Sequence, residues 1–244
     1  MHLIKVSAIN STNSFARELL KENPHLPLTC IVAKKQTQGR GQRGTTWSAE
    51  GGKNLTFSVF LPRPNISPVQ QFVLSATIAT SVISALEKFE LPRLKVKWPN
   101  DILSANQKLA GILIENIISE GKVTGSIIGV GLNVNQEEFG GLPQAGSMKT
   151  VTGKEFRLEE VLDVVLRELE KGFSELSEEN SEEILNTYKN ALFRRLVPST
   201  FRDAQGSLFT GMILDVSPSG KLRVQREEKE EVTEFDLKEV SLCY

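Results

Sequence analysis

Residues 39–62, GRGQRGTTWSAEGGKNLTFSVFLP, decide the fold class, because a glycine-rich loop here runs into a strand instead of a helix. Gly39, Gly41 and Gly44 match the dinucleotide-binding pattern G-x-G-x-x-G. In that fold the glycines lead directly into a helix whose N-terminus meets the pyrophosphate. Turn-forming residues follow here, and residues 54–61 then have the composition of a strand. The stretch therefore predicts a flap that joins two strands and argues against a dinucleotide-binding fold.

The composition of the flap suits an anionic ligand. Its glycines let backbone N–H groups approach an anion, and Arg40 and Arg43 can grip phosphate or carboxylate oxygens. The flap is not a P-loop, because Lys53 is followed by Asn54 and Trp47 stands where that motif has its first glycine. A nucleotide bound here would be held by a flexible segment.

The segments around the flap predict an α+β fold, with helices packed on a mixed or antiparallel sheet. Strands are expected at residues 3–9, 30–36, 54–61, 94–98, 101–103, 108–118 and 123–134, and helices at residues 12–23, 67–89, 158–176 and 181–193. Turn residues at 105–107 and 120–122 favour antiparallel hairpins after residue 94. Residues 135–150 are rich in Gly, Pro and polar residues and predict a mobile loop.

The end of the chain returns to a β pattern after Pro198. Short apolar runs at residues 207–217, 221–227, 232–236 and 240–244 predict four or five strands. So many strands in so few residues indicate a small β-barrel appended to the main fold. We therefore expect two domains, residues 1–196 and residues 197–244.

The chain as a whole excludes several function classes. A net charge of −1 gives no sign of a general nucleic-acid binder. The N-terminus lacks a signal peptide's apolar segment, and no stretch is expected to cross a membrane. Two cysteines and two histidines, His2 and His25, match no zinc or redox spacing and make a Ser-His-Asp hydrolase improbable. We expect a cytoplasmic protein that binds neither DNA nor membrane.

Five polar or glycine-rich motifs occur in a specific order: STN at 11–13, GRGQRG at 39–44 with Trp47, KWPND at 97–101, KLAG at 108–111 and GVGLNVN at 129–135. In this order and spacing they strongly resemble the catalytic domain of biotin protein ligases. The resemblance covers about residues 5–150, and the terminal barrel is similar to that family's C-terminal domain. It implies that biotin and ATP form biotinyl-5′-adenylate, which then modifies a lysine of an acceptor protein.

The resemblance also implies the site residues. Arg40 and Lys108 are the expected catalytic residues, stabilising charge on the phosphoryl oxygens together with Mg²⁺. The expected contacts to biotin or the adenylate are Ser11, Thr12, Asn13, Gln36, Gly39, Arg40, Gly41, Gln42, Arg43, Trp47, Lys97, Asn100, Lys108, Gly111 and Asn133. Asp101 is the expected Mg²⁺ ligand, or it orients the incoming lysine. Simpler interpretations exist, since Ser11 to Asn13 could be only a helix cap and residues 99–101 only a turn.

Two departures from the family pattern carry expectations of their own. Gln42 stands where many members have arginine, so it can donate hydrogen bonds but brings no charge to the adenylate. Some members carry an N-terminal DNA-binding domain, whereas this chain starts with the strand before STN. We therefore expect a ligase without repressor activity.

The implied partner is the biotin carboxyl carrier protein or domain of acetyl-CoA carboxylase or a related carboxylase. A homodimer through an exposed strand edge stays open. Two alternatives remain: a lipoate protein ligase, and a non-catalytic biotin-binding module whose ligase motifs are vestigial. The GRGQRG and KWPND motifs argue against the first, and the presence of both Arg40 and Lys108 argues against the second.

Overall fold

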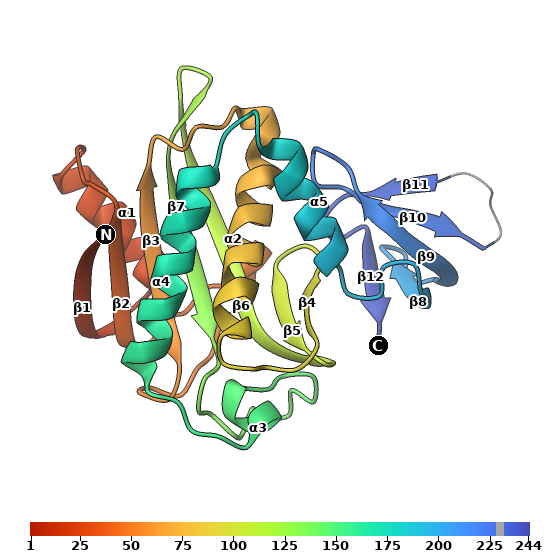
Figure 1. Cartoon of the computed structure of the whole chain (residues 1–244), viewed down its shortest axis with the longest axis horizontal. Helices are drawn as coiled ribbons and strands as arrows, with labels where there is room; N and C mark the ends of the chain where they lie inside the picture. Colours follow the sequence, from red (N-terminus) through yellow and green to blue (C-terminus); the bar gives the residue numbers. More distant parts are fainter. Residues whose placement is uncertain (228–231) are drawn as a thin grey trace.

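The computed structural model describes residues 1–227 and 232–244, except for the side chain of Arg43. A large mixed sheet carries helices on both faces, and a smaller antiparallel sheet lies beside it (Figure 1). The strands of the large sheet are β1 (His2–Ile9), β2 (Thr29–Gln36), β3 (Leu55–Pro62), β4 (Leu94–Lys97), β5 (Asp101–Ser104), β6 (Gln107–Ser119) and β7 (Lys122–Leu132). The predicted fold class is confirmed.

The order of the large sheet is β1-β2-β3-β7-β6-β5-β4. Only β1 and β2 run parallel, and every other neighbouring pair is antiparallel. The strands after residue 94 form the predicted hairpin meander. The flap leaves β2 and returns to the adjacent strand β3, which confirms that it joins strand to strand.

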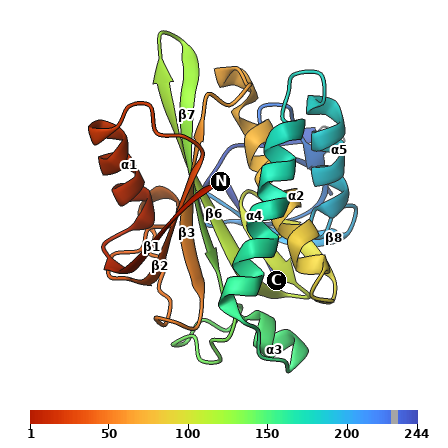
Figure 2. The same cartoon turned by 60° about the vertical axis from the view of Figure 1, so that its left-hand side comes forward.

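The two faces of the sheet pack against different helices. Figure 2 shows α1 (Thr12–Glu22) on one side of the sheet, and α2 (Gln71–Glu87), α4 (Leu158–Glu175) and α5 (Ser181–Ala191) on the other. Neighbouring residues alternate between these layers, as the period of a strand requires: Ile31 packs under α1, whereas Cys30 belongs to the larger core. The site described below lies on the α1 side.

Helix α2 is the central core helix, and it corrects one expectation. With its preceding 3₁₀ turn η2 (Pro68–Gln70) it is long and apolar enough, by length and composition alone, to cross a bilayer. No such stretch was expected from the sequence. In the fold the apolar surface of α2 is covered by the sheet and by helices α4 and α5, so its hydrophobicity is explained by burial in the core.

The smaller sheet has the order β11-β10-β9-β8-β12, with each pair antiparallel. Its strands are β8 (Pro198–Asp203), β9 (Leu208–Val216), β10 (Leu222–Arg226), β11 (Val232–Phe235) and β12 (Val240–Cys243). The segment between the sheets bonds to both, because Phe193 N donates to Val96 O and Leu196 N donates to Ile213 O, each at 2.8 Å. The sheets are therefore joined by backbone as well as by side chains.

The prediction of a loop over residues 135–150 is wrong for its last three residues, 148–150. Residues Met148–Thr152 form the short helix α3. Ser147 caps it by accepting a hydrogen bond from the N–H of Thr150 at 3.1 Å, and Gly153 ends it with a φ of 71°. A capping box of Ser and Thr is a weak signal in a stretch dominated by glycine, which explains the error.

Candidate active site

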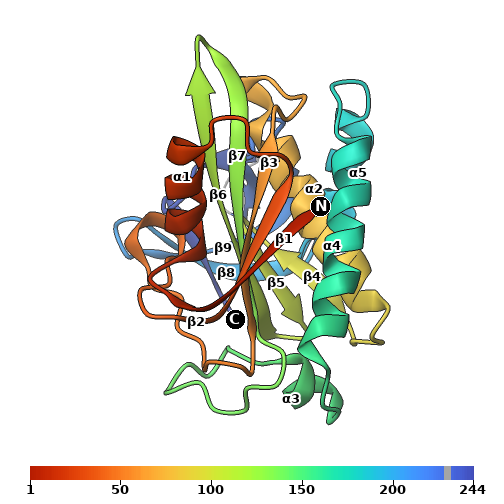
Figure 3. The ribbon, with the colours of Figure 1, turned by 90° about the vertical axis from the view of Figure 1, so that its left-hand side faces the viewer.

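A cavity of about 250 Å³ lies on the α1 side of the large sheet, between the flap and the glycine-rich ends of β6 and β7. It is lined by Ser11, Thr12, Asn13, Gln36, Arg40, Gly41, Gln42, Thr45, Thr46, Trp47, Phe57, Asn100, Asp101, Lys108, Gly111, Ile112, Leu113, Gly129, Val130 and Gly131. Figure 3 shows how far apart in the sequence the contributing elements are, from α1 to β7. The fold thus brings residues of all five motifs around one cavity.

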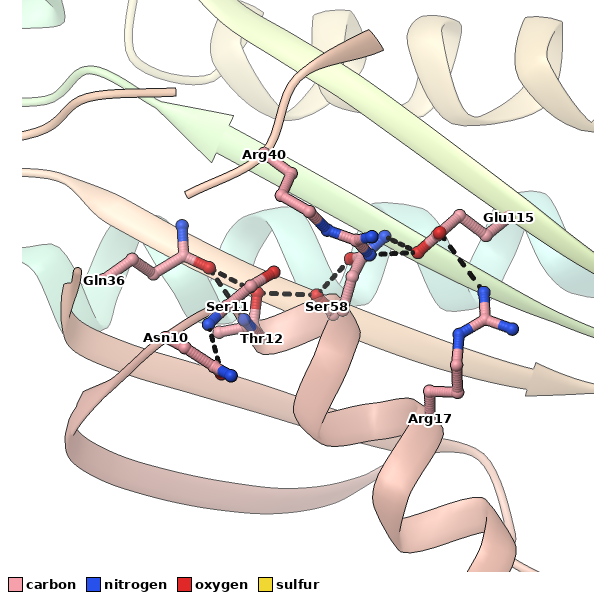
Figure 4. Close-up of polar contacts among 9 residues, drawn as sticks. Asn10, Ser11, Thr12, Arg17, Gln36, Arg40, Ser58 and Glu115 are labelled. Carbon is pink, nitrogen blue, oxygen red and sulfur yellow. Dashed lines mark hydrogen bonds and ion pairs between the residues drawn. The ribbon is translucent and has the colours of Figure 1, made fainter. Parts of the chain in front are cut away.

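The floor of the cavity is a network of neutral polar groups at the start of α1 (Figure 4). Thr12 donates to Gln36 Oε1 twice, from its backbone N–H at 2.7 Å and from its hydroxyl at 3.1 Å. Ser58 Oγ lies 2.6 Å from Thr12 Oγ1 and 2.5 Å from Asn13 Oδ1. These side chains carry no charge and have their positions fixed by one another, so they suit a neutral polar ligand group.

Ser11 occupies the N-cap position of α1, but its side chain makes no cap hydrogen bond. Ser11 is buried, at 4% exposure, and lines the cavity. The helix-cap interpretation of Ser11 to Asn13 is therefore wrong for the side chains, since those of Thr12 and Asn13 bond to the floor network instead.

The flap is folded over the cavity as a small hairpin. Gly41 N donates to Thr45 O at 2.7 Å, and Trp47 N donates to Gly39 O at 3.0 Å. The indole of Trp47 lies on Gly111 and Gly131, which are direct partners on β6 and β7. A Cβ at Gly131 would overlap the ring, so glycine is required for this contact. The flap is thereby held by an aromatic ring lying on bare backbone.

Two cations from different elements line the same cavity. Arg40 Nη2 of the flap lies 2.8 Å from Glu115 Oε2. Lys108 Nζ at the start of β6 lies 2.6 Å from Asp101 Oδ1 on β5. Each cation is thus paired with a carboxylate near a polar cavity, an arrangement that can receive an anionic ligand by exchange of partners.

Three expected residues lie outside the lining of this cavity. Gly39 lies at the base of the flap hairpin. Asn133 is buried and donates to Gly146 O at 2.9 Å, which ties β7 to the loop before α3. Lys97 has its Nζ 4.8 Å from the centroid of the Tyr244 ring, and burial lowers its pKa, opposed by the charge of Asp101 and reinforced by that of Lys108. The side chain of Arg43 lies outside the described residues.

Within the KWPND segment, residues 98–100 form the turn between β4 and β5, near the turn that the simpler interpretation put at 99–101. Two specific contacts hold this turn in place. Asn100 Nδ2 donates to Ile112 O at 2.7 Å, which fixes the turn against β6. Trp98 Nε1 donates to Gly220 O at 2.8 Å, in the smaller sheet's β9–β10 connection. The turn therefore connects the cavity to the C-terminal sheet.

The family follows from comparison with known proteins. A model described as the biotin/lipoate A/B protein ligase family matches residues 6–133, more than half of the 244 residues. The chain belongs to this family. Every residue that lines the cavity of this biotin/lipoate ligase family member, from Ser11 to Gly131, lies within the matched segment.

Two curated relatives show which ligases the chain is similar to in sequence. The bifunctional ligase/repressor BirA of Bacillus subtilis is 38% identical over 136 residues, 56% of this chain and 41% of the relative. The biotin–[acetyl-CoA-carboxylase] ligase of Paracoccus denitrificans is 32% identical over 139 residues, 57% of this chain and 56% of the relative. The chain thus matches about half the length of these relatives.

A solved ligase resembles the chain over almost its whole length. The biotin protein ligase from Aquifex aeolicus, solved with biotin and ATP, has a TM-score of 0.80 and 28% identity. The match covers 99% of this chain and 98% of that one, so both sheets of this family member have counterparts in one known structure.

Several lining residues of this ligase family member were missed in the sequence. Gly129 and Gly131 alternate on β7 and leave room for Asn13 and Trp47, since a Cβ at Gly129 would lie 2.5 Å from Asn13 Oδ1. The repeated glycines in GVGLNV were the available signal, because glycine at every second strand position clears one face. Thr45, Thr46 and Phe57 gave no such signal.

Proposed function

We propose that this protein activates biotin with ATP as biotinyl-5′-adenylate and transfers the biotinyl group to a lysine of an acceptor protein. The observation that carries the proposal is the shared cavity of Arg40 and Lys108, whose cations come from separate elements. The likeness to the Aquifex aeolicus ligase solved with biotin and ATP supports the choice of substrates.

The proposed chemistry begins with two anions that must meet. The biotin carboxylate attacks the α-phosphorus of ATP, the bond to the bridging oxygen breaks, and pyrophosphate leaves. Arg40 and Lys108 would offset the repulsion between the anions and stabilise charge on the phosphoryl oxygens. An acceptor amine then attacks the mixed anhydride carbonyl, and AMP leaves with the bonding electron pair while the amine loses a proton.

The neutral floor would bind the other end of biotin. Ser11, Thr12, Asn13 and Gln36 offer donors and acceptors without charge, which match the ureido ring. The cations lie on the flap and on β6, so the two ends of one ligand would meet two different kinds of surface. Trp47 would cover the ligand between them.

Mg²⁺ would enter as the complex of ATP. No group of three or more metal-ligating side chains occurs in residues 1–227 and 232–244. One carboxylate, Asp101, lines the cavity and is paired with Lys108. Such a sparse donor set suits Mg²⁺, which binds through few carboxylates when phosphates supply the remaining ligands. That Asp101 contacts the ion stays a prediction.

The biological setting is proposed on the same grounds. The acceptor would be a biotin carboxyl carrier protein or domain, and the reaction would take place in the cytoplasm. The division into domains at residue 196 is supported by the separate five-stranded sheet that starts at Pro198. The absence of DNA binding stays a prediction, which a gel shift at low salt would test, and sedimentation analysis would decide whether the chain forms a homodimer.

The decisive experiment is ATP–pyrophosphate exchange with biotin and with lipoate as separate substrates. Exchange with biotin alone is expected, since the uncharged floor is matched to the ureido ring, which lipoate lacks. Exchange with lipoate alone would favour a lipoate ligase. Exchange with neither, accompanied by biotin binding in calorimetry, would favour the non-catalytic module.

A further inference from the structure

Glu115 is a partly buried carboxylate that the proposed reaction does not use. It lies on β6, four residues beyond Gly111 and therefore on the same face of the strand. Its side chain is 22% exposed. Both carboxylate oxygens are engaged, and the donors come from α1 and from the flap (Figure 4).

The contacts of Glu115 join the flap to the floor. Oε2 accepts from Arg40 Nη2 and from Asn13 Nδ2, each at 2.8 Å, while Oε1 lies 3.2 Å from Arg17 Nη2. Asn13 and Arg17 lie one helical turn apart on α1, so both reach the same carboxylate. Asn13 also bonds to Ser58 through its other amide atom. One carboxylate thus connects the neutral network to the flap cation.

The charges show how Glu115 can hold Arg40 without cancelling it. Two guanidinium groups surround one carboxylate, so the cluster keeps a net positive charge toward an incoming anion. Among the described residues, Arg40 contacts the carboxylate through Nη2, and a guanidinium has several N–H donors in a fixed fork. The rest of the fork remains able to bind phosphate or carboxylate oxygens.

We propose that Glu115 is a positioning residue: it holds the guanidinium of Arg40 over the cavity before the substrates bind. This inference rests on the proposed function for its catalytic consequence, but not for its structural one. A guanidinium that is already oriented avoids the cost of ordering its long side chain during the reaction. If Arg40 shifts toward the ligand, Arg17 still neutralises the negative charge of Glu115.

The test replaces Glu115 by glutamine, which keeps the size of the side chain and removes its charge. Single-turnover formation of biotinyl-adenylate at saturating biotin should slow by about 10- to 100-fold, because a misplaced catalytic group costs rate. Glu159→Gln is the matched control, since it breaks the exposed pair of Glu159 with Lys5 on the other side of the sheet. The control should react at the wild-type rate.

A double variant separates positioning from a merely structural role. If Glu115 acts through Arg40, adding Glu115→Gln to Arg40→Ala should change the rate by less than about twofold. If the fold reductions in rate of the two single variants multiply in the double variant, the inference is overturned. Glu115→Asp, which keeps the charge but shortens the reach, should also slow the reaction without lowering the thermal unfolding midpoint.

Hydrogen exchange in the ligand-free protein gives a readout that does not depend on activity. Amides of residues 39–47 should exchange faster in Glu115→Gln than in the wild type and in Glu159→Gln. If the wild type activates no biotin but Glu115→Gln loosens the flap, the proposed function fails and the positioning role stands. If the wild type is active and Glu115→Gln neither loosens the flap nor slows the reaction, this inference fails.

Discussion

At the scale of single residues, Gln42 borders two cavities from the flap. It lines the candidate active site and also a neighbouring cavity of about 370 Å³, which lies against the connections of the smaller sheet. The amide of Gln42 brings no charge to this position, where the family resemblance led us to expect arginine. Retention of an anionic intermediate would therefore depend on Arg40 and Lys108.

Gln42→Arg is expected to slow the release of free biotinyl-adenylate, because an added guanidinium attracts the phosphate of the intermediate. Release can be followed by separating free from bound intermediate after a single turnover. Gln42→Met, of similar size and without charge, serves as the control. An unchanged release rate in the arginine variant would contradict the prediction.

Cys30 predicts a measurable pH dependence of stability. Burial in the larger core raises the pKa of its thiol from 9.0 to about 12. Below pH 9 both states keep the proton; above it the unfolded state loses the proton first, so the free energy of unfolding falls as the pH rises toward the folded pKa. By about pH 10.5 the loss should be about 2 kcal/mol.

Urea unfolding of the wild type and Cys30→Ala at several alkaline pH values checks this prediction. The variant should show a shallower decline above pH 9, while Cys243→Ala, which changes a less buried thiol, should keep the wild-type decline. Equal declines in all three proteins would mean that the Cys30 thiol is not protected from ionisation by burial.

At the scale of elements, the paired glycines of β6 and β7 make the surface on which Trp47 lies. Gly131→Ala should displace the indole and weaken biotin binding by about tenfold, or about 1.4 kcal/mol. Gly129→Ala should act on the floor instead, by pushing against Asn13. Titration calorimetry gives the affinities for biotin. The double variant with Trp47→Ala and Gly131→Ala shows whether the loss at Gly131 arises through displacement of the Trp47 indole. An additive loss in that double variant would contradict the route through Trp47.

The flap and the loop before α3 are expected to gain order when the ligand binds. Residues 39–53 contain five glycines, and ligand contacts must offset their conformational entropy. Hydrogen exchange at residues 39–53 and 136–147 should slow in the presence of biotinyl-adenylate. Helix α2 provides the internal control, since its buried amides should not change. Equally slow exchange in both states would contradict the prediction.

At the scale of the whole molecule, the joint between the two sheets can be tested with two glycines of equal conformation. Gly220 and Gly206 both have a φ of 89°, but a Cβ at Gly220 would overlap the ring of Phe72, whereas a Cβ at Gly206 has no atom within 4 Å. Gly206→Ala should cost about 1 kcal/mol of unfolding free energy for its backbone alone. Gly220→Ala should cost about 3 kcal/mol, because the overlap adds to the same backbone term.

Urea unfolding of both variants measures the difference. Gly220 O also accepts the hydrogen bond from Trp98, so the larger loss should be accompanied by a change in tryptophan fluorescence before global unfolding. Equal losses of unfolding free energy in the two variants would show that the contact between Gly220 and Phe72 can open without destabilising the fold.

The sequence by itself determined the elements and the motif residues. Apolar periodicity predicted α2, α4 and the hairpin meander, because these segments bury one side or all sides in a single core. The glycine pattern, followed by a strand, correctly excluded a dinucleotide fold. Arg40 and Lys108 were predicted to converge, and they line one cavity.

Only the tertiary structure decided what each motif residue contacts. Asn133, expected in the pocket, is bonded to Gly146, and Lys97 lies beside Tyr244. Glu115 could not be recognised, because its partners Asn13, Arg17 and Arg40 are brought to it by sheet order and helix packing. Local propensity is a property of neighbours in the chain, whereas a site of this kind depends on distances between segments that meet only after folding.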